Sequence, residues 1–266
     1  MSTYSFEHQV FLKKKKRERI LIGFSRLFII VLFLSIWEYF VQIGLLNSFL
    51  YSSPSRISMT ILSLIQSGQL FKHILITLYE VFISFFISSF LGIFIAFLFW
   101  RFPLLSKILD PYLTILNSLP KVALGPLIII WVGAGTPSII LMALLISIFS
   151  TIIQTYTGFI SVPERYLILL KSFQAKPLSI FTKLSLPYNY ETIISCLKIN
   201  ISLTLIGVIM GELLVSKSGL GYLIMYGSQV FQLDLVISSI VLLGIISYLM
   251  YFILDKISIF IHKKRG

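Results

Sequence analysis

The chain contains few charged residues and a single cysteine. Only 12% of its 266 residues are charged, whereas soluble domains carry about 25%. Cys196 excludes a disulfide framework within the chain and lies in an apolar run, where core packing is its expected role. With 57% hydrophobic residues and a mean hydropathy of +0.97, the composition indicates an integral membrane protein.

The sequence also lacks the patterns of common catalytic and nucleotide-binding sites. His8, His73 and His262 are far apart and show no metal-ligand spacing. We recognise no Ser/His/Asp or Cys/His nucleophile set and no G-x-x-x-x-G-K-[ST] phosphate loop. We therefore expect a chain that is not an enzyme and holds no metal or cofactor. If ATP is used, another chain must bind it.

The net charge of +12 is concentrated beside apolar segments. KKKKRER (13–19) precedes the first apolar run, and HKKRG (262–266) follows the last. Basic clusters that flank spanning helices are typical of the cytoplasmic face of a membrane. This distribution favours contact with a lipid bilayer and argues against nucleic acid. The first run also exceeds the core of a signal peptide and no A-x-A site follows it, so we expect it to be retained.

Six stretches are apolar over the roughly 20 residues that a membrane-crossing helix needs. They cover residues 27–46, 74–99, 111–132, 137–160, 191–214 and 234–255. With both termini inside, seventeen of the 22 basic residues fall in the predicted cytoplasmic parts. We therefore predict an all-α membrane protein with six transmembrane helices. Its expected parts are a basic segment (1–26), a first helix with an outer helix (27–73), a core (74–255) that contains a cytoplasmic loop (161–190), and a basic tail (256–266).

The segment between the first two spans predicts a short amphipathic helix at the outer surface. Ser53 is a candidate N-cap, and Pro54 suits the first helical position. Gly68 would end this helix. Its apolar positions share one face and are Ile57, Ile61, Leu64 and Ile65.

The third span is interrupted by prolines at 111, 120 and 126. Two interpretations are open: a kinked bundle helix, or a broken helix that lines a translocation path. Lys121 favours the second, because an ammonium group at this depth needs protein, water or an acid beside it. Asn117 and Lys121 are four residues apart and would share a face if Pro120 leaves that face intact.

Further polar residues lie within predicted spans. Glu80, Lys198 and Glu212 are each candidates for the path or for a structural ion pair, and we hypothesise that Glu212 pairs with Lys121. Gly207 and Gly211 form a G-x-x-x-G pattern, which is most simply a close helix–helix contact.

The segment LLKSFQAKPLSIFTKLSLP (169–187) is amphipathic and too polar to span. Its lysines lie mainly off an apolar stripe, and Pro177 suits the first turn of a second short helix. We therefore expect two brief helices around a turn on the cytoplasmic side. Such helices can lie on lipid, pack on their own bundle, or dock into a groove on a partner. The stripe consists of Leu170, Phe173, Pro177, Phe181 and Leu184.

Residues 161–187 resemble the coupling loop of binding-protein-dependent ABC transporter permeases. LSLP (184–187) keeps the end of the family pattern Glu-Ala-Ala, three residues, Gly, nine residues, Ile-x-Leu-Pro. Further matches to the nitrate/sulfonate/taurine branch extend the resemblance from about residue 27 to 255. They are SLPKVALGPLIIIWVGAGTPS (118–138), GFISVPERYL (158–167), GELLVSKSGLGYLI (211–224), IWEYF (36–40), SSPSRI (52–57) and SGQL (67–70).

The resemblance implies a type I importer permease fold and a set of partners. Two permease subunits, here expected to be a homodimer, would form the path, two ATPase subunits would bind ATP and Mg²⁺, and an extracytoplasmic binding (lipo)protein would deliver a small polar solute. Sulfonate, nitrate or taurine-like anions and thiamine-pyrimidine precursors are the implied substrates, and the bacterial cell membrane is the implied location. An ATP-independent secondary transporter or channel is the alternative.

The resemblance also assigns roles to residues. ATPase coupling falls to Arg165, Leu170, Phe173, Gln174, Pro177, Phe181, Leu184 and Pro187. The path falls to Asn117, Lys121, Glu80 and Glu212, and gating or packing to Pro120, Pro126, Gly207, Gly211, Gly219 and Gly221. The chain departs from the family pattern at Ile168, where the acid is lost, and at Gln174, which replaces the glycine and must avoid a positive φ or accept a strain of about 1 kcal/mol. We expect Phe173 and Phe181 to compensate by filling an apolar groove on the ATPase.

Overall fold

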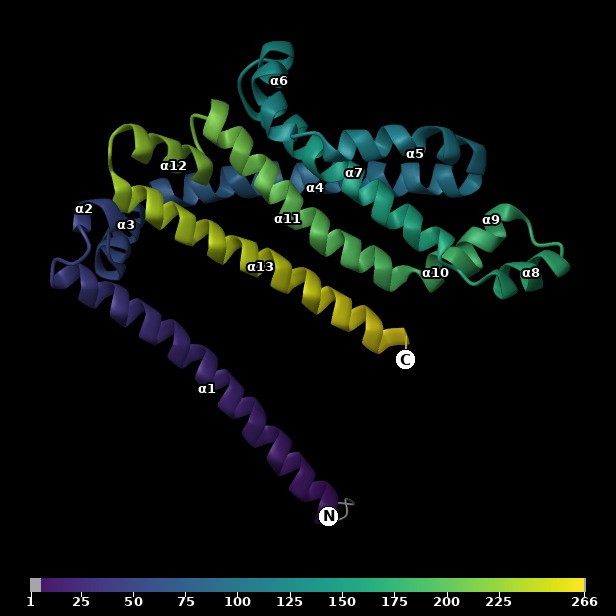
Figure 1. The fold of residues 1–266 in the computed structure, drawn as a ribbon, viewed down its shortest axis with the longest axis horizontal. Coiled ribbons are helices and arrows are strands. Elements are labelled where there is room, and N and C mark those ends of the chain that lie inside the picture. The colour runs from purple at the N-terminus through teal and green to yellow at the C-terminus, as the bar shows by residue number, and fades with distance from the viewer. Residues whose placement is uncertain (1–5, 266) are drawn as a thin grey trace. The chain divides into compact units, whose positions relative to one another are not determined.

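The computed structural model describes residues 6–265, which are helical with no strand among them (Figure 1). The first five residues of the 1–26 segment and the last residue of the basic tail lie outside this description. The helices are α1 Phe6–Gln42, α2 Ser48–Tyr51, α3 Pro54–Gln66, α4 Gln69–Arg101, α5 Pro103–Ser118, η1 Lys121–Leu124, α6 Gly125–Val132, α7 Thr136–Ile160, α8 Glu164–Ser172, α9 Pro177–Ile180, η2 Phe181–Ser185, α10 Leu186–Tyr188, α11 Tyr190–Val215, α12 Leu220–Gln229 and α13 Leu233–Arg265.

Five helices of the described chain are long and apolar enough to cross a membrane. They are α1, α4, α7, α11 and α13, and the pair formed by α5 with η1 and α6 supplies a sixth candidate span. This agrees with the six predicted stretches. The basic segment before the first stretch is itself helical, and α1 ends at Gln42 instead of 46, because Gly44 adopts a φ of 76°.

Within the described residues, the chain up to residue 63 forms one compact unit and the chain from residue 64 onward a second. In the first unit, the Ser55 hydroxyl and backbone N–H both donate to the Glu38 carboxylate, at 2.8 and 3.0 Å, and join α3 to α1. The Ser53 hydroxyl accepts from the Arg56 N–H at 3.3 Å. The predicted N-cap of the outer helix is therefore confirmed.

The second unit packs α4, α7, α11 and α13 along one another (Figure 1). The start of α7 bonds near the start of α4, because Thr136 donates to Glu80 at 2.9 Å. Their far ends meet where the Phe99 and Tyr156 ring centroids lie 5.8 Å apart. The two helices are therefore parallel. α11 runs the opposite way, since Glu212 near its end accepts from Thr77 near the start of α4.

The third span is broken. α5 and the η1–α6 segment meet at an angle of 83°, with Pro120 at the junction and Pro126 in the first turn of α6. Proline has no N–H to continue the helical ladder, which explains the position of the break. Because α4 and α7 are parallel, this bent pair must carry the chain from the end of α4 back to the start of α7.

The predicted G-x-x-x-G contact is confirmed as a close crossing of α11 and α7. A Cβ on Gly207 would overlap the Ala143 backbone, and one on Gly211 would lie 2.9 Å from the Ile139 Cα. Polar side chains add to the contacts of the bundle, since the Asn200 amide donates to the Ser88 and Ser89 hydroxyls at 3.0 and 2.7 Å. Small residues and interhelical hydrogen bonds are how helices associate where lipid removes the hydrophobic drive.

Candidate translocation path and coupling loop

The interrupted third span places Asn117 and Lys121 together. The Lys121 ammonium donates to the Asn117 side-chain oxygen at 3.1 Å and lies 5.5 Å from the centroid of the Phe149 ring. The shared face therefore survives the break at Pro120. Lys121 is half-buried, whereas most of α5 and α6 is exposed. Asn117 and Lys121 thus lie on a bent and largely exposed segment. This is the arrangement expected of a helix that lines a translocation path.

The hypothesised pair of Lys121 with Glu212 is wrong. Lys121 contacts Phe149 on α7, thirteen residues beyond Thr136, which bonds to Glu80 beside Glu212. At a rise of about 1.5 Å per residue, this separation is about 20 Å. The prediction paired Glu212 with Lys121 because their charges are opposite. The sequence carried no signal that the two residues lie at different depths along the bundle.

Glu80 and Glu212 instead lie inside the bundle, each with 1% of its surface exposed. Glu212 accepts hydrogen bonds from the Thr77 hydroxyl and from the Gly221 N–H, both at 2.6 Å. A Cβ on Gly219 would overlap the Glu212 carboxylate. The glycine-rich loop that joins α11 to α12 therefore packs closely against this side chain. Both carboxyl groups therefore accept hydrogen bonds from residues inside the second unit.

The polar residues and glycines around Glu212 were only partly predictable from the sequence. The sequence indicated Gly219 and Gly221 as gate or packing residues, but not Thr77, Thr136 or His73, which bond to the same structure. Single threonines within apolar runs carry no periodic signal. The short helix α12, which follows the loop, was likewise not expected.

Lys198, the other basic residue predicted within a span, has a structural partner. Its ammonium donates to the Asp255 carboxylate at 2.6 Å and joins α11 to α13. A cavity of about 440 Å³ lies beside it, lined by Ser195, Ile199, Ser202, Leu203 and Tyr251. Within the described residues, no group of three or more His, Cys, Asp or Glu side chains could hold a metal ion.

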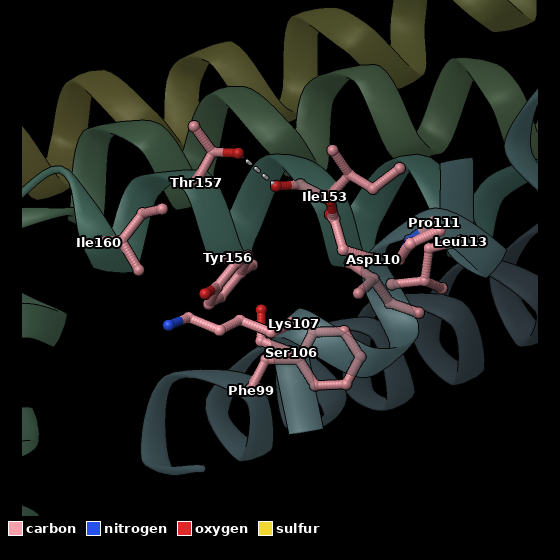
Figure 2. Close-up of a pocket in the computed structure, with 11 residues that line it drawn as sticks. Phe99, Ser106, Lys107, Asp110, Pro111, Leu113, Ile153, Tyr156, Thr157 and Ile160 are labelled. Atoms are coloured by element: carbon pink, nitrogen blue, oxygen red, sulfur yellow. Dashed lines mark hydrogen bonds between the residues drawn. The ribbon is translucent and has the colours of Figure 1, made fainter. Parts of the chain in front are cut away.

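A second cavity, of about 450 Å³, lies at the opposite end of the bundle from Glu212, between α5 and α7 (Figure 2). The Lys107 and Tyr156 side chains extend toward the same side of it, and Phe99 of α4 closes its edge. This cavity adjoins the end of α7, which leads directly into the loop 161–190. Its volume is within the range of about 300–1,000 Å³ that is typical of small-molecule sites.

The loop 161–190 forms the expected short helices, α8 and α9, followed by one π-helical turn, η2. Between the helices, Gln174 adopts a φ of 54°. Of the two options for this position, the chain takes the left-handed conformation that glycine adopts without strain. The predicted turn is therefore confirmed, and it is built with a residue that disfavours it.

One predicted coupling residue is buried in the bundle. Phe181 is 9% exposed and packs its ring against Phe97, Trp100 and Phe159, with ring centroids 4.6 to 5.0 Å apart. It therefore does not fill a groove on a partner, and our expectation was wrong for this residue. The helical stripe could not distinguish packing on its own bundle from docking.

The apolar surface that the loop presents is different from the predicted stripe. Phe173 is 74% exposed, as expected of a docking residue, whereas Leu170 and Leu184 are half-buried. Ile168 and Leu169 on α8 and Leu178 on α9 are also exposed, at 59%, 53% and 62%. Arg165, Gln174 and Pro177 are exposed, and Pro187 is half-buried where the chain re-enters the bundle. We call Ile168, Leu169, Phe173 and Leu178 the loop patch.

These features define a class: an all-helical protein with several helices long and apolar enough to span a membrane, a broken third span and an exposed amphipathic loop. Residues 88–264 match the family described as "Binding-protein-dependent transport system inner membrane component". The chain belongs to this family. It is a permease subunit of an ABC importer, a transport subunit and not an enzyme.

Relatives and a solved structure agree with this assignment. A probable ABC transporter permease of Haemophilus influenzae is 30% identical, over 86% of this chain and 93% of the relative. The putative aliphatic sulfonates transport permease SsuC of Bacillus subtilis is 28% identical, over 89% and 86%. The formylaminopyrimidine transport permease ThiX of Halalkalibacterium halodurans is 29% identical, over 70% and 74%.

The fold is that of a type I importer permease. An inward-facing structure of the MetNI methionine ABC transporter superposes with a TM-score of 0.63 at 20% identity, over 72% of this chain and 95% of the matched chain.

Proposed function

We propose that two copies of this chain form the translocation path of an ABC importer, with both termini on the cytoplasmic side. Two ATPase subunits bind ATP and Mg²⁺ beneath the path, and an extracytoplasmic binding (lipo)protein delivers the solute above it. The family description and the basic clusters at both ends of the chain support this arrangement.

The single observation that carries the proposal is the exposure of the loop patch. Four large apolar side chains, between 53% and 74% exposed, stand on a loop that also carries Arg165, Lys171 and Lys176. Apolar anchors within a charged rim are typical of a docking surface for a protein partner. On this proposal, closure of the ATPase pair moves the loop, and η2 and Phe181 transmit the movement to α4 and α7.

The proposed solute is small and polar, either a sulfonate-like anion or a thiamine-pyrimidine-like precursor. The names of the SsuC and ThiX relatives support these two classes. Asn117 and Lys121 at the break supply an amide and a cation, which can contact both an acidic and a neutral polar group. On this proposal, selectivity between the two classes of solute rests mainly with the binding protein.

The test is co-purification. The tagged chain is expressed with the ATPase and binding protein encoded beside it, and the Phe173→Asp variant is compared with the unchanged chain. We expect loss of the ATPase, because a carboxylate replaces the most exposed member of the loop patch. Phe231→Asp is the matched control, since Phe231 is 70% exposed at the other end of the bundle.

A folded Phe173→Asp variant that retains its ATPase would contradict the role of the patch. Phe181→Asp separates the two kinds of phenylalanine. It should reduce the amount of folded permease, because it introduces a charge among buried rings.

A further inference from the structure

Two acidic side chains lie against one another in the interior of the second unit. Glu80 comes from α4 and Glu212 from α11, and each is 1% exposed. The Thr77 hydroxyl, about one helical turn before Glu80 on α4, donates to Glu212, which places the two carboxyl groups beside one another. Acid side chains within spanning helices are rare and need a partner, so a pair of like sign requires its own explanation.

The hydrogen bonds around Glu212 define its state. Thr77 Oγ1 accepts from the Leu220 N–H at 2.9 Å, so its own proton is directed to Glu212 Oε1, 2.6 Å away. The Gly221 N–H donates to Glu212 Oε2. Both oxygens of Glu212 therefore receive a proton donor, which is the environment of a carboxylate.

Glu80 is satisfied at only one oxygen. Its Oε1 accepts from the Thr136 hydroxyl at 2.9 Å, whereas its buried Oε2 receives no hydrogen bond from an N–H or hydroxyl group. A buried carboxylate oxygen without a donor is strongly unfavourable. A proton on the pair removes this deficit, because an O–H of one carboxyl can then donate to the other.

Among the residues that the structure describes, no cation compensates the pair. In the described part of the chain, neither carboxyl forms an ion pair. On α4, His73 accepts from the Gly219 N–H at Nδ1, which requires a neutral ring, and Lys72 beside it is exposed. Lys217, after α11, is also exposed, and the nearby ionisable groups of α12 are the phenols of Tyr222 and Tyr226.

Two like charges in contact and out of water are not both ionised. We propose that Glu80 and Glu212 bind one proton between them, as a carboxylic acid and a carboxylate. The donors that point at Glu212 would repel a metal cation but leave room for a shared proton. This site goes beyond the proposed transport function and does not depend on it.

The bound proton would stabilise the junction of α4, α7, α11 and the glycine-rich loop. Glu80 holds the start of α7 through Thr136, and Glu212 holds the loop at Gly221. Loss of the proton leaves two adjacent carboxylates and pushes these elements apart. On this proposal, stability is therefore present while the shared proton is bound and is lost once the pH rises far enough to remove it.

The test uses the purified full-length permease in lipid nanodiscs. Glu80→Gln replaces the shared proton, because the new amide donates to Glu212 while its oxygen still accepts from Thr136. We expect this variant to lose the infrared C=O stretch of a protonated carboxylic acid. We also expect its unfolding temperature to stay level on alkalinisation, where that of the unchanged protein falls.

Glu212→Gln should behave differently, because its amide would direct protons at the Gly221 N–H or the Thr77 O–H and clash with one of them. It should unfold at a lower temperature at every pH. Glu18→Gln, an exposed acid outside the pair, is the control and should match the unchanged protein in both measurements. Retention by Glu80→Gln of both the carboxylic acid band and the fall in unfolding temperature would overturn the proposal.

Discussion

At the scale of single residues, Gln174 is placed in a conformation that its side chain disfavours. Its φ of 54° is the left-handed region in which a Cβ approaches the following carbonyl. The residue is exposed, so its side chain gains little from packing to offset the strain. The turn between α8 and α9 is therefore a weak point of the loop that we propose transmits force.

Substitutions at position 174 should show this strain. Gln174→Val should destabilise the loop by about 1 kcal/mol or more, because β-branched residues are least tolerated at positive φ. Gln174→Gly should be neutral or stabilising by up to about 1 kcal/mol, since relief of strain offsets the greater entropy of the unfolded chain. Hydrogen exchange of the amides in 161–190 measures both effects.

Lys176→Val is the matched control, because Lys176 has an ordinary φ of −64°. Equal protection in Gln174→Val and Lys176→Val would show that the left-handed turn carries no strain.

The contact at Gly207 makes a second prediction about one residue. Gly207→Ala should lower the free energy of unfolding by about 1–3 kcal/mol, because the new methyl group overlaps the backbone of Ala143 and forces α11 from α7. Gly244→Ala, on α13 with open space at its Cβ, should be neutral or stabilising by up to about 1 kcal/mol. Thermal unfolding in detergent distinguishes the two variants. Equal unfolding temperatures for Gly207→Ala and Gly244→Ala would contradict the close contact of α11 with α7.

At the scale of elements, the helices were predictable and their partners were not. Apolar runs of about 20 residues gave the spans because a backbone in lipid must satisfy its own hydrogen bonds. The break at Pro120 was predictable because proline lacks an N–H. The burial of Phe181, the bonds of Thr77 and the depth of Lys121 depend on which helices become neighbours, and one sequence carries no local signal for that choice.

The ion pair between α11 and α13 is one such contact between elements. A double-mutant cycle of Lys198→Gln and Asp255→Asn should give a coupling energy of about 0.5–1.5 kcal/mol, a modest value because both side chains are partly exposed. The same cycle with Lys256→Gln should give a value near zero, since Lys256 instead lies over the Phe252 ring. Equal coupling in both cycles would mean that the 2.6 Å contact adds nothing beyond general electrostatics.

At the scale of the whole molecule, the direction of the helices determines which loops share a side of the membrane. α4 and α7 are parallel and α11 is antiparallel to both, so the starts of α4 and α7 and the end of α11 lie at one end of the second unit. The loop 161–190 lies at the other end. Lys171 and Lys217 therefore stand at opposite ends of α11, both exposed.

This geometry makes the proposed orientation testable with one reagent. The native Cys196 is 2% exposed and should not react, so single cysteines can be introduced without removing it. A membrane-impermeant maleimide added to intact spheroplasts should label Lys217→Cys and should label Lys171→Cys only after permeabilisation. The reverse pattern would mean that the chain is inserted the other way round, with the loop patch facing away from any ATPase. Labelling of both from outside would mean that α11 does not cross the membrane, and the proposed path would then have to be built without it.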